Sequence, residues 1–309
     1  MLHLSINHLE RLQISKRYLS NLKFYRIYIE LANVCGLRCS FCPTKNLPST
    51  TMSLEFFDSI VKQAKKYTNE IACHVVGDPL TLSNLKEYLD IIHKYKMKAL
   101  LTTSGYFMKK HNDETLFHPS IKQINISLNA FNKNDTSISF EQYMKPILEL
   151  CHEKVKQKKE IFINLRMWNL DEIMSEKEFN TILFNRLESE FSVKLELDSL
   201  DIKEKKSIRL DNKVLLHFDN YFEWPSLQNI VYGHGTCQGL SSHIGILANG
   251  DVIPCCLDLE AVMKLGNLHN SSLEDTLYDS RATDMIDGFK EAKCSEEMCL
   301  RCSYKNRFN

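Results

Sequence analysis

The chain has 309 residues, with 43% apolar and 25% charged residues, which is typical of a globular protein with a full-sized core. Its 39 Lys and Arg residues balance its 39 Asp and Glu residues, so the formal net charge is zero. No overall field therefore draws the chain to nucleic acid or to an anionic membrane, and a nucleic-acid partner is not favoured.

The N-terminal segment shows no targeting or membrane-spanning pattern. Residues 1–5 lack a charged head followed by an apolar core, and no apolar run in the chain approaches the roughly 18 residues that cross a bilayer. We expect a cytoplasmic protein with no membrane partner. Apolar residues at helical spacing predict an amphipathic helix over residues 1–24.

The middle of the chain alternates between short β-rich runs and helical patterns. Strands are predicted at residues 25–31, 71–76, 97–103, 121–128, 161–168 and 193–197. Helices are predicted near residues 53–67, 83–96, 106–117, 139–157 and 175–190. The last two helices begin with capping-box sequences, Ser139-Phe140-Glu141-Gln142 and Ser175-Glu176-Lys177-Glu178.

This alternation predicts an α/β fold with parallel strands and helical crossovers over residues 25–200. Six strand–helix units are too few for a closed eight-stranded barrel. A partial, open barrel and an open sheet covered on both faces remain. In either case the functional groups should gather at the C-terminal ends of the strands.

The composition changes toward the C-terminus. The alternation stops in a bridging region, residues 201–235, and six of the eleven cysteines lie from Cys237 onward. Asn249-Gly250, between two apolar runs, predicts a β-hairpin, and Ser271-Ser272-Leu273-Glu274 predicts the start of a helix. Residues 236–309 should therefore form a small β-hairpin-plus-helix domain organised by metal.

Three cysteines follow the first predicted strand: Cys35, Cys39 and Cys42, at spacings of 4 and 3. Clustered cysteines in a chain without an export signal favour metal ligation over disulfide bonds. Three thiolates on one loop can hold a [4Fe–4S] cluster and leave one iron open, which is typical of a catalytic site. A zinc site completed by a distant His or Cys is the alternative.

The stretch resembles the CxxxCxΦC signature of the radical S-adenosylmethionine (AdoMet) enzymes, with Phe41 at the aromatic position. Gly77-Asp78-Pro79 resembles the Gly-Glu-Pro-like turn that holds the AdoMet amino group, although Asp replaces Glu. Thr102-Thr103-Ser104-Gly105 is similar to the family's Thr-Thr-Asn-Gly turn. The resemblance implies that the AdoMet contacts include Phe41, Gly77, Asp78, Pro79, Thr103, Ser104, Ser127, Asn164 and Arg166.

The resemblance implies a partial (β/α)6 barrel and an enzyme that cleaves AdoMet reductively to a 5′-deoxyadenosyl radical. That radical takes a hydrogen atom from a substrate. An external flavodoxin- or ferredoxin-like protein would supply the electron. Arg166 and His74 are the candidates for a catalytic role, because both lie on predicted strands of the barrel.

A second set of cysteines, Cys237, Cys255, Cys299 and Cys302, resembles the Twitch domain, a shortened relative of the SPASM domain. That domain holds one auxiliary [4Fe–4S] cluster, which implies two clusters in this chain and an electron-transfer role for the second. Cys256 is an alternative to Cys255, because adjacent side chains of a strand point to opposite faces. A zinc knuckle is the alternative metal site. We expect Cys73, Cys151, Cys256 and Cys294 to be packing residues more often than ligands.

The resemblance leaves the substrate open between a peptide or protein side chain and a small alcohol. A tRNA or rRNA base is a third substrate class, which the neutral charge disfavours. The contrasting hypothesis is a non-catalytic zinc or iron–sulfur scaffold that presents a binding surface.

Overall fold

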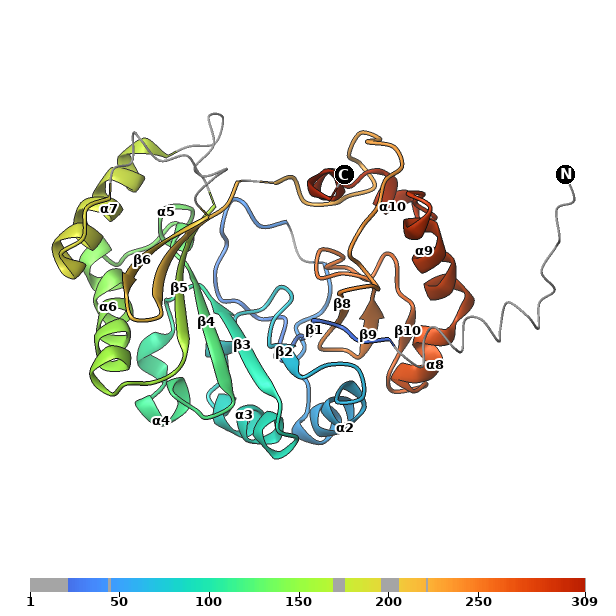
Figure 1. Ribbon diagram of the computed structural model, residues 1–309, viewed down its shortest axis with the longest axis horizontal. Helices are drawn as coiled ribbons and strands as arrows, with labels where there is room; N and C mark the ends of the chain where they lie inside the picture. The colour runs from blue at the N-terminus through green and yellow to red at the C-terminus, as the bar shows by residue number, and fades with distance from the viewer. Residues whose placement is uncertain (1–21, 44–45, 169–175, 196–205, 221, 309) are drawn as a thin grey trace, which may run out of the picture. The chain divides into compact units, whose positions relative to one another are not determined.

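The computed structural model describes residues 22–43, 46–168, 176–195, 206–220 and 222–308. The predicted N-terminal helix lies outside these residues except for residues 22–24, which are not helical. The chain divides into two compact units (Figure 1). Unit 1 comprises Met1–Asn33, Lys45–Val75 and Glu223–Asn309, and unit 2 comprises Val34–Thr44 and Val76–Phe222. Each unit is made of separate segments of the chain, whereas the predicted domains are continuous. The predicted domain boundaries stay a prediction.

Unit 2 is built on five neighbouring strands. They are, in spatial order, β3 (Lys98–Thr103), β4 (Ile121–Ser127), β5 (Phe162–Met167), β7 (Val214–Phe218) and β6 (Ser207–Asp211). The first four are parallel to one another, and β6 pairs antiparallel with β7. Along β5, Ile163, Leu165 and Met167 are fully buried. The polar residues between them face the other side of the sheet.

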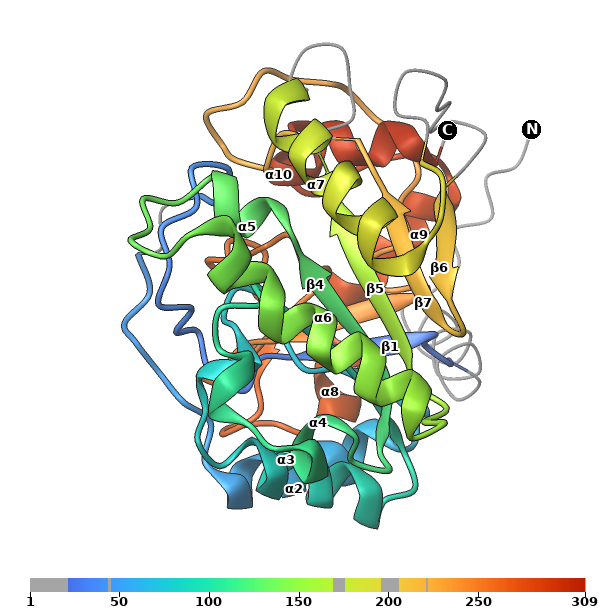
Figure 2. The same cartoon turned by 90° about the vertical axis from the view of Figure 1, so that its left-hand side faces the viewer.

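Helices provide the crossovers of unit 2. They are α3 (Leu85–Lys94), α4 (Asp113–Leu116), α5 (Asn129–Asn132), α6 (Phe140–Lys156) and α7 (Lys177–Phe191), with short 3₁₀ turns at Pro79–Thr81 and Met108–Lys110. Figure 2 shows α6 crossing the face of β4 and β5. The capping box of α6 is confirmed. Ser139 Oγ accepts from the Gln142 backbone at 3.2 Å, and Gln142 Oε1 accepts from the Ser139 backbone at 2.8 Å. Ser175 of the second predicted capping box lies outside the described residues.

The predicted sixth strand at residues 193–197 is wrong, since residues 193–195 are not in a strand and the rest lie outside the described residues. The sixth strand is β7, which lies in the segment that we expected to be a bridge and pairs in parallel with β5. A tight turn in which Lys213 has a φ of 55° joins β6 to β7. Because β7 is only five residues long, its apolar pattern gave too weak a signal.

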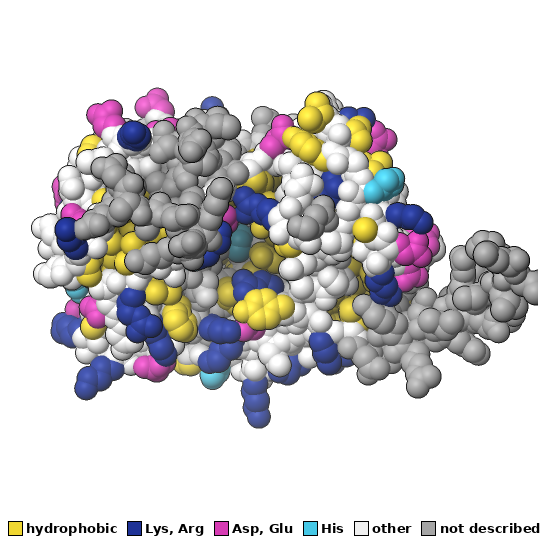
Figure 3. Space-filling model, turned by 45° about the horizontal axis from the view of Figure 1, so that its top comes forward, with side chains coloured by type: hydrophobic (Ala, Val, Ile, Leu, Met, Phe, Trp, Pro, Cys, Tyr) yellow, Lys and Arg dark blue, Asp and Glu magenta, His cyan; other side chains and the backbone are white. Residues whose placement is uncertain are grey.

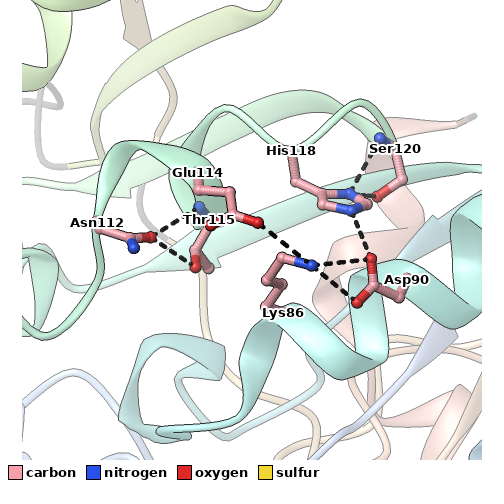
Figure 4. A network of polar contacts seen from close by, with 7 residues as sticks. All are labelled: Lys86, Asp90, Asn112, Glu114, Thr115, His118 and Ser120. Atoms are coloured by element: carbon pink, nitrogen blue, oxygen red, sulfur yellow. Dashed lines mark hydrogen bonds and ion pairs between the residues drawn. The ribbon is translucent and has the colours of Figure 1, made fainter.

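A polar network ties α3 to α4 and to the start of β4 (Figure 4). Lys86 Nζ lies 3.0 Å from Asp90 Oδ2 and 3.5 Å from Glu114 Oε1. The buried His118 ring lies 3.0 Å from Asp90 Oδ1 and 2.8 Å from Ser120 Oγ. Burial lowers the pKa of His118, so the ring is a neutral hydrogen-bonding group. The network fixes the loop that leads into β4.

Unit 1 combines a short parallel sheet with an antiparallel extension. Its strands are, in spatial order, β10 (Gly266–Asn267), β9 (Asp251–Ile253), β8 (His243–Ile246), β1 (Arg26–Ile29) and β2 (Glu70–Ala72). The pairs β8–β1 and β1–β2 are parallel, and β8–β9 and β9–β10 are antiparallel. The helices are α2 (Leu54–Ala64), α8 (Leu273–Tyr278), α9 (Ser280–Lys290) and α10 (Glu297–Leu300), with a 3₁₀ turn at Ser303–Arg307.

The predicted hairpin around Asn249-Gly250 is confirmed as β8–β9. Gly250 has a φ of 86°, and a Cβ there would lie 2.9 Å from the Phe56 ring, so only glycine fits this turn. The following helix begins one residue later than predicted, with Ser272 accepting from the Asp275 backbone at 3.0 Å. Among the described residues, no helix is long and apolar enough to cross a bilayer.

Candidate active site and auxiliary metal centre

The loop of Cys35, Cys39 and Cys42 is anchored within unit 2. The Ser40 backbone donates to Lys133 O at 2.9 Å. The Cys42 backbone donates to Cys39 O at 3.0 Å, which closes a turn between two of the cysteines. Gly36 has a φ of 73°, and a Cβ there would lie 3.0 Å from the Phe107 ring. The loop therefore has a defined path with glycine at its tightest point.

Asn134 links this loop to the segment after α5. Its Oδ1 accepts from the Arg38 backbone at 2.8 Å, and its Nδ2 lies 2.9 Å from Cys39 Sγ. Hydrogen bonds to ligand sulfurs stabilise the thiolate and tune an iron–sulfur cluster. The sequence reasoning missed Asn134, because it lies 95 residues after Cys39 and no local pattern marks it.

Cys39 is buried, Cys35 and Phe41 are half-buried, and Cys42 is exposed. The three thiols lie on one loop, and one of them accepts a hydrogen bond from Asn134. Such thiols suit an iron–sulfur cluster that is bound to the protein through three of its irons. Each cysteine of the loop makes further interactions within the protein. The assignment of the three as cluster ligands stays a prediction.

The carboxylate of Asp78 is buried and fully engaged inside unit 2. Its Oδ1 accepts from the Leu80 backbone at 3.0 Å, and its Oδ2 accepts from Thr103 Oγ1 at 2.9 Å. Oδ2 also accepts from the backbone and the hydroxyl of Ser104. Burial raises the pKa of Asp78, against the opposing effect of these donors. The side chain therefore holds the Gly77-Asp78-Pro79 turn in place, and only the backbone of that turn is left for a ligand.

The ends of β4, β5 and β7 bring polar residues into register. Ser127, Arg166 and His217 are neighbours across the three strands. One step earlier, Asn164 Nδ2 donates to Asn125 Oδ1 at 3.1 Å. These are the strand positions where the sequence placed Ser127, Asn164 and Arg166, whereas His217 was not predicted. The predicted catalytic candidate His74 lies in unit 1 and Arg166 in unit 2.

Cys237, Cys255, Cys299 and Cys302 all lie in unit 1, before β8, after β9, in α10 and just after it. The Cys255 thiol interacts electrostatically with Cys237 and Cys299, and the Cys299 thiol with Cys302. Burial raises the pKa of all four thiols. They would stay protonated until a bound metal displaced the protons. Four half-buried cysteines gathered from distant segments suit an auxiliary cluster.

Cys256 faces a different neighbour from Cys255. Its thiol and the Tyr28 hydroxyl on β1 form a hydrogen bond. The Cys256 thiol also interacts electrostatically with Cys237, so the choice of Cys255 as the ligand stays a prediction. Cys294, expected to be a packing residue, interacts with Cys237 and Cys299, whereas burial raises the pKa values of Cys73 and Cys151 to about 12.

No three Cys, His, Asp or Glu side chains in the described part of the chain are grouped closely enough to hold a single metal ion. A four-iron cubane takes one thiolate at each corner, so its ligands are spread more widely than those of one ion.

Two family models match the sequence. Residues 29–176 match the radical SAM superfamily, and residues 237–303 match SPASM, an iron-sulfur cluster-binding domain. The second match contains all four cysteines of the C-terminal set. A comparison with curated proteins gave no match.

Several solved structures share the fold. SuiB of Streptococcus suis, bound to S-adenosylmethionine, is 17% identical with a TM-score of 0.59, and the alignment covers 97% of this chain and 79% of SuiB. BtrN in complex with AdoMet and 2-DOIA is 15% identical with a TM-score of 0.54, covering 91% of this chain and 93% of BtrN. Native anSMEcpe with AdoMet and the Cp18Cys peptide is 14% identical with a TM-score of 0.53, covering 90% and 86%.

The α/β fold with an open, mostly parallel sheet and a C-terminal iron–sulfur domain is thus the one that the sequence predicted. The chain belongs to the radical SAM superfamily and carries a SPASM-type C-terminal domain. It is an enzyme whose cofactors are [4Fe–4S] clusters and AdoMet, which decides against the scaffold hypothesis.

Proposed function

We propose that this enzyme cleaves AdoMet at a [4Fe–4S] cluster on Cys35, Cys39 and Cys42 and oxidises or cross-links a peptide or protein side chain. The observation that carries the proposal is the anchored cysteine loop of unit 2, with Asn134 aimed at Cys39 Sγ. When bound, the cluster and AdoMet together supply a 5′-deoxyadenosyl radical.

The protein side chains hold the reactants. Asp78 fixes the turn whose backbone would receive the AdoMet amino group. Ser127 would approach the ribose, and Asn164 and Arg166 would lie near the methionine carboxylate or the substrate. The backbone carbonyl of Ser104 accepts a hydrogen bond of 2.7 Å from the buried Tyr143 hydroxyl, and this bond holds the end of β3 rigidly. Rigid placement of the reacting groups is the main contribution of the protein to cofactor chemistry.

The second proposed site is the auxiliary cluster on Cys237, Cys255, Cys299 and Cys302. Four cysteine ligands would leave no iron open, which favours electron transfer over substrate ligation. An external flavodoxin- or ferredoxin-like protein is the proposed electron donor. Support for a peptide substrate comes from two relatives of the same fold, SuiB bound to the precursor peptide SuiA and anSMEcpe with the Cp18Cys peptide.

A small alcohol is the second candidate substrate, because BtrN is solved with 2-DOIA and is covered over 93% of its chain. A tRNA or rRNA base is less favoured. On the face in Figure 3, Lys and Arg side chains are interspersed with Asp and Glu side chains, in keeping with the zero net charge of the chain.

Anaerobic reconstitution tests the proposal. The wild-type protein should hold about eight irons as two [4Fe–4S] clusters and release 5′-deoxyadenosine from AdoMet under dithionite. Cys35→Ala should abolish this release, whereas Cys299→Ala should retain part of it and bind about four irons fewer. A colourless zinc protein, or full AdoMet cleavage by Cys35→Ala, would contradict the proposal.

A further inference from the structure

Three buried polar atoms on one face of β5 and β7 have no hydrogen-bond partner among the described residues. They are Asn164 Oδ1, Trp168 Nε1 and His217 Nδ1. A buried polar atom without a hydrogen-bond partner destabilises the fold, so each of the three is expected to have a partner in the working enzyme. Three of them on one face mark a surface shaped for a ligand, and we name Asn164, Arg166, Trp168 and His217 the β5–β7 polar face.

The amide of Asn164 has a fixed orientation. Its Nδ2 donates to Asn125 Oδ1 at 3.1 Å, and Gln123 Nε2 donates to the same oxygen at 2.7 Å. Asn125 Nδ2 in turn donates to Thr102 Oγ1 at 3.3 Å. This chain of amides leaves Asn164 Oδ1 as an acceptor that requires a donor from outside the network.

Trp168 and His217 present the complementary chemistry. The indole Nε1 is a donor and cannot accept. Arg166 lies with its guanidinium carbon 4.5 Å from the centre of the Trp168 ring, which fixes the ring, and Trp168 also contacts Phe222 at 5.8 Å. His217 on β7 is the neighbour of Arg166 on β5. Burial and the charge of Arg166 lower the pKa of His217, against the effect of Asp219, so the ring is neutral and offers one donor and one acceptor.

The spacing of these groups sets the size of the ligand. Asn164, Arg166 and Trp168 follow one another at alternate positions, so the Cα atoms of Asn164 and Trp168 are about 13 Å apart at 3.3 Å per residue. An extended peptide repeats its own carbonyl and amide groups at the same spacing. An extended peptide of about four residues matches this backbone length and carries both donors and acceptors.

Resting on the proposed function, we infer that the β5–β7 polar face binds an extended peptide segment of about four residues along β5. A backbone amide of the substrate would donate to Asn164 Oδ1, and backbone carbonyls would accept from Trp168 Nε1 and His217. The surface lies one strand beyond Ser127 of β4, the proposed neighbour of the AdoMet ribose. Asn164, Trp168 and His217 are therefore substrate-binding residues in this account.

The test uses the reconstituted holoenzyme with a random pool of acetylated pentapeptide amides, and myo-inositol as the polyol probe. In a Trp224→Phe background, Trp168 is the one remaining tryptophan and reports binding by its fluorescence. The peptide pool should change this fluorescence and accelerate 5′-deoxyadenosine release, and inositol should do neither. His217→Leu and Asn164→Leu should each weaken the response to the pool about tenfold. His217→Gln should restore part of it, since the amide keeps a donor and an acceptor.

In His217→Leu the response to the peptide pool should fall more than the AdoMet affinity. Arg209→Gln, at an exposed position on β6, is the matched control and should behave as wild type. A response to inositol alone, no response to either probe, or an equal loss of AdoMet affinity in His217→Leu overturns the inference. A wild-type protein that releases no 5′-deoxyadenosine at all refutes the proposed function, whereas release without any peptide response refutes this inference only.

Discussion

The carboxylate of Asp78 binds Ser104 twice, through the backbone N–H at 2.8 Å and through the hydroxyl at 2.7 Å. This pair joins the proposed AdoMet-amino turn to the end of β3, so two parts of the proposed AdoMet site share one buried acceptor. The sequence marked Asp78 as a departure from the Glu of the family. Its shorter side chain reaches the β3 end within hydrogen-bond distance, which explains how an Asp serves here.

Replacing Asp78 with Asn should destabilise unit 2. Ser104, Thr103 and Leu80 all donate hydrogen bonds to the carboxylate. The amide N–H groups of Asn would face at least one of these donors and could not accept its hydrogen bond. Loss of charge-assisted hydrogen bonds at a buried site costs about 2 kcal/mol. Urea unfolding of the holoenzyme should show a lower midpoint, with weaker AdoMet binding.

Asp78→Glu should not restore wild-type behaviour, because Asp78 is 2% exposed and an added methylene has no room. Thr81→Ser is the control, since the Thr81 hydroxyl bonds the Asp78 carbonyl rather than its carboxylate. If Asp78→Asn unfolds at the wild-type urea concentration and binds AdoMet normally, the positioning role is wrong.

Asn134→Leu should slow AdoMet cleavage about tenfold, as is typical when a group outside the ligand set is removed. The Nδ2–Sγ contact of 2.9 Å stabilises the Cys39 thiolate, and its loss should make the cluster harder to reduce. An electron paramagnetic resonance titration would show a lower reduction potential. Lys133→Ala is the control, since Lys133 contacts the loop through its backbone carbonyl. An unchanged potential in Asn134→Leu would remove the tuning role.

Cys255→Ser and Cys256→Ser should differ in iron content. Cys255 interacts with Cys237 and Cys299, whereas Cys256 interacts with Cys237 and hydrogen-bonds with Tyr28. Cys255→Ser should lose the auxiliary cluster and bind about four irons instead of about eight, while Cys256→Ser keeps both clusters. Iron and sulfide analysis with Mössbauer spectroscopy measures this. Full iron content in Cys255→Ser together with loss in Cys256→Ser would reverse the assignment.

Most of the strands and helices could be predicted from local sequence patterns. The capping box at Ser139 and the hairpin at Gly250 are set by residues close in sequence, so they were predictable. Asn134 and His217 were not. Each acquires its role from a partner that is distant in the chain, Cys39 for Asn134 and Arg166 for His217. The strand β7, with only five residues, also shows that a short parallel strand forms because of its pairing with a neighbouring strand more than because of its own apolar pattern.

Acid should destabilise unit 1 through His243. Burial, aided by the charge of Arg26, lowers the pKa of His243 to about 4, below the unfolded value of about 6.5. Between these two pH values the histidine binds a proton in the unfolded chain but stays neutral in the folded protein. The contribution of His243 to the free energy of unfolding is therefore full above pH 6.5 and declines as the pH falls toward 4. From pH 7 to pH 5 the loss from this group should be about 2 kcal/mol.

Urea unfolding of the holoenzyme and of His243→Leu at both pH values isolates the effect of this ring. The variant should lose less stability than the wild type between pH 7 and pH 5, because leucine has no proton to bind. His93→Leu, which removes an exposed histidine, is the control and should keep the wild-type pH dependence. Parallel curves for the wild type and His243→Leu would show that the acid sensitivity comes from other groups.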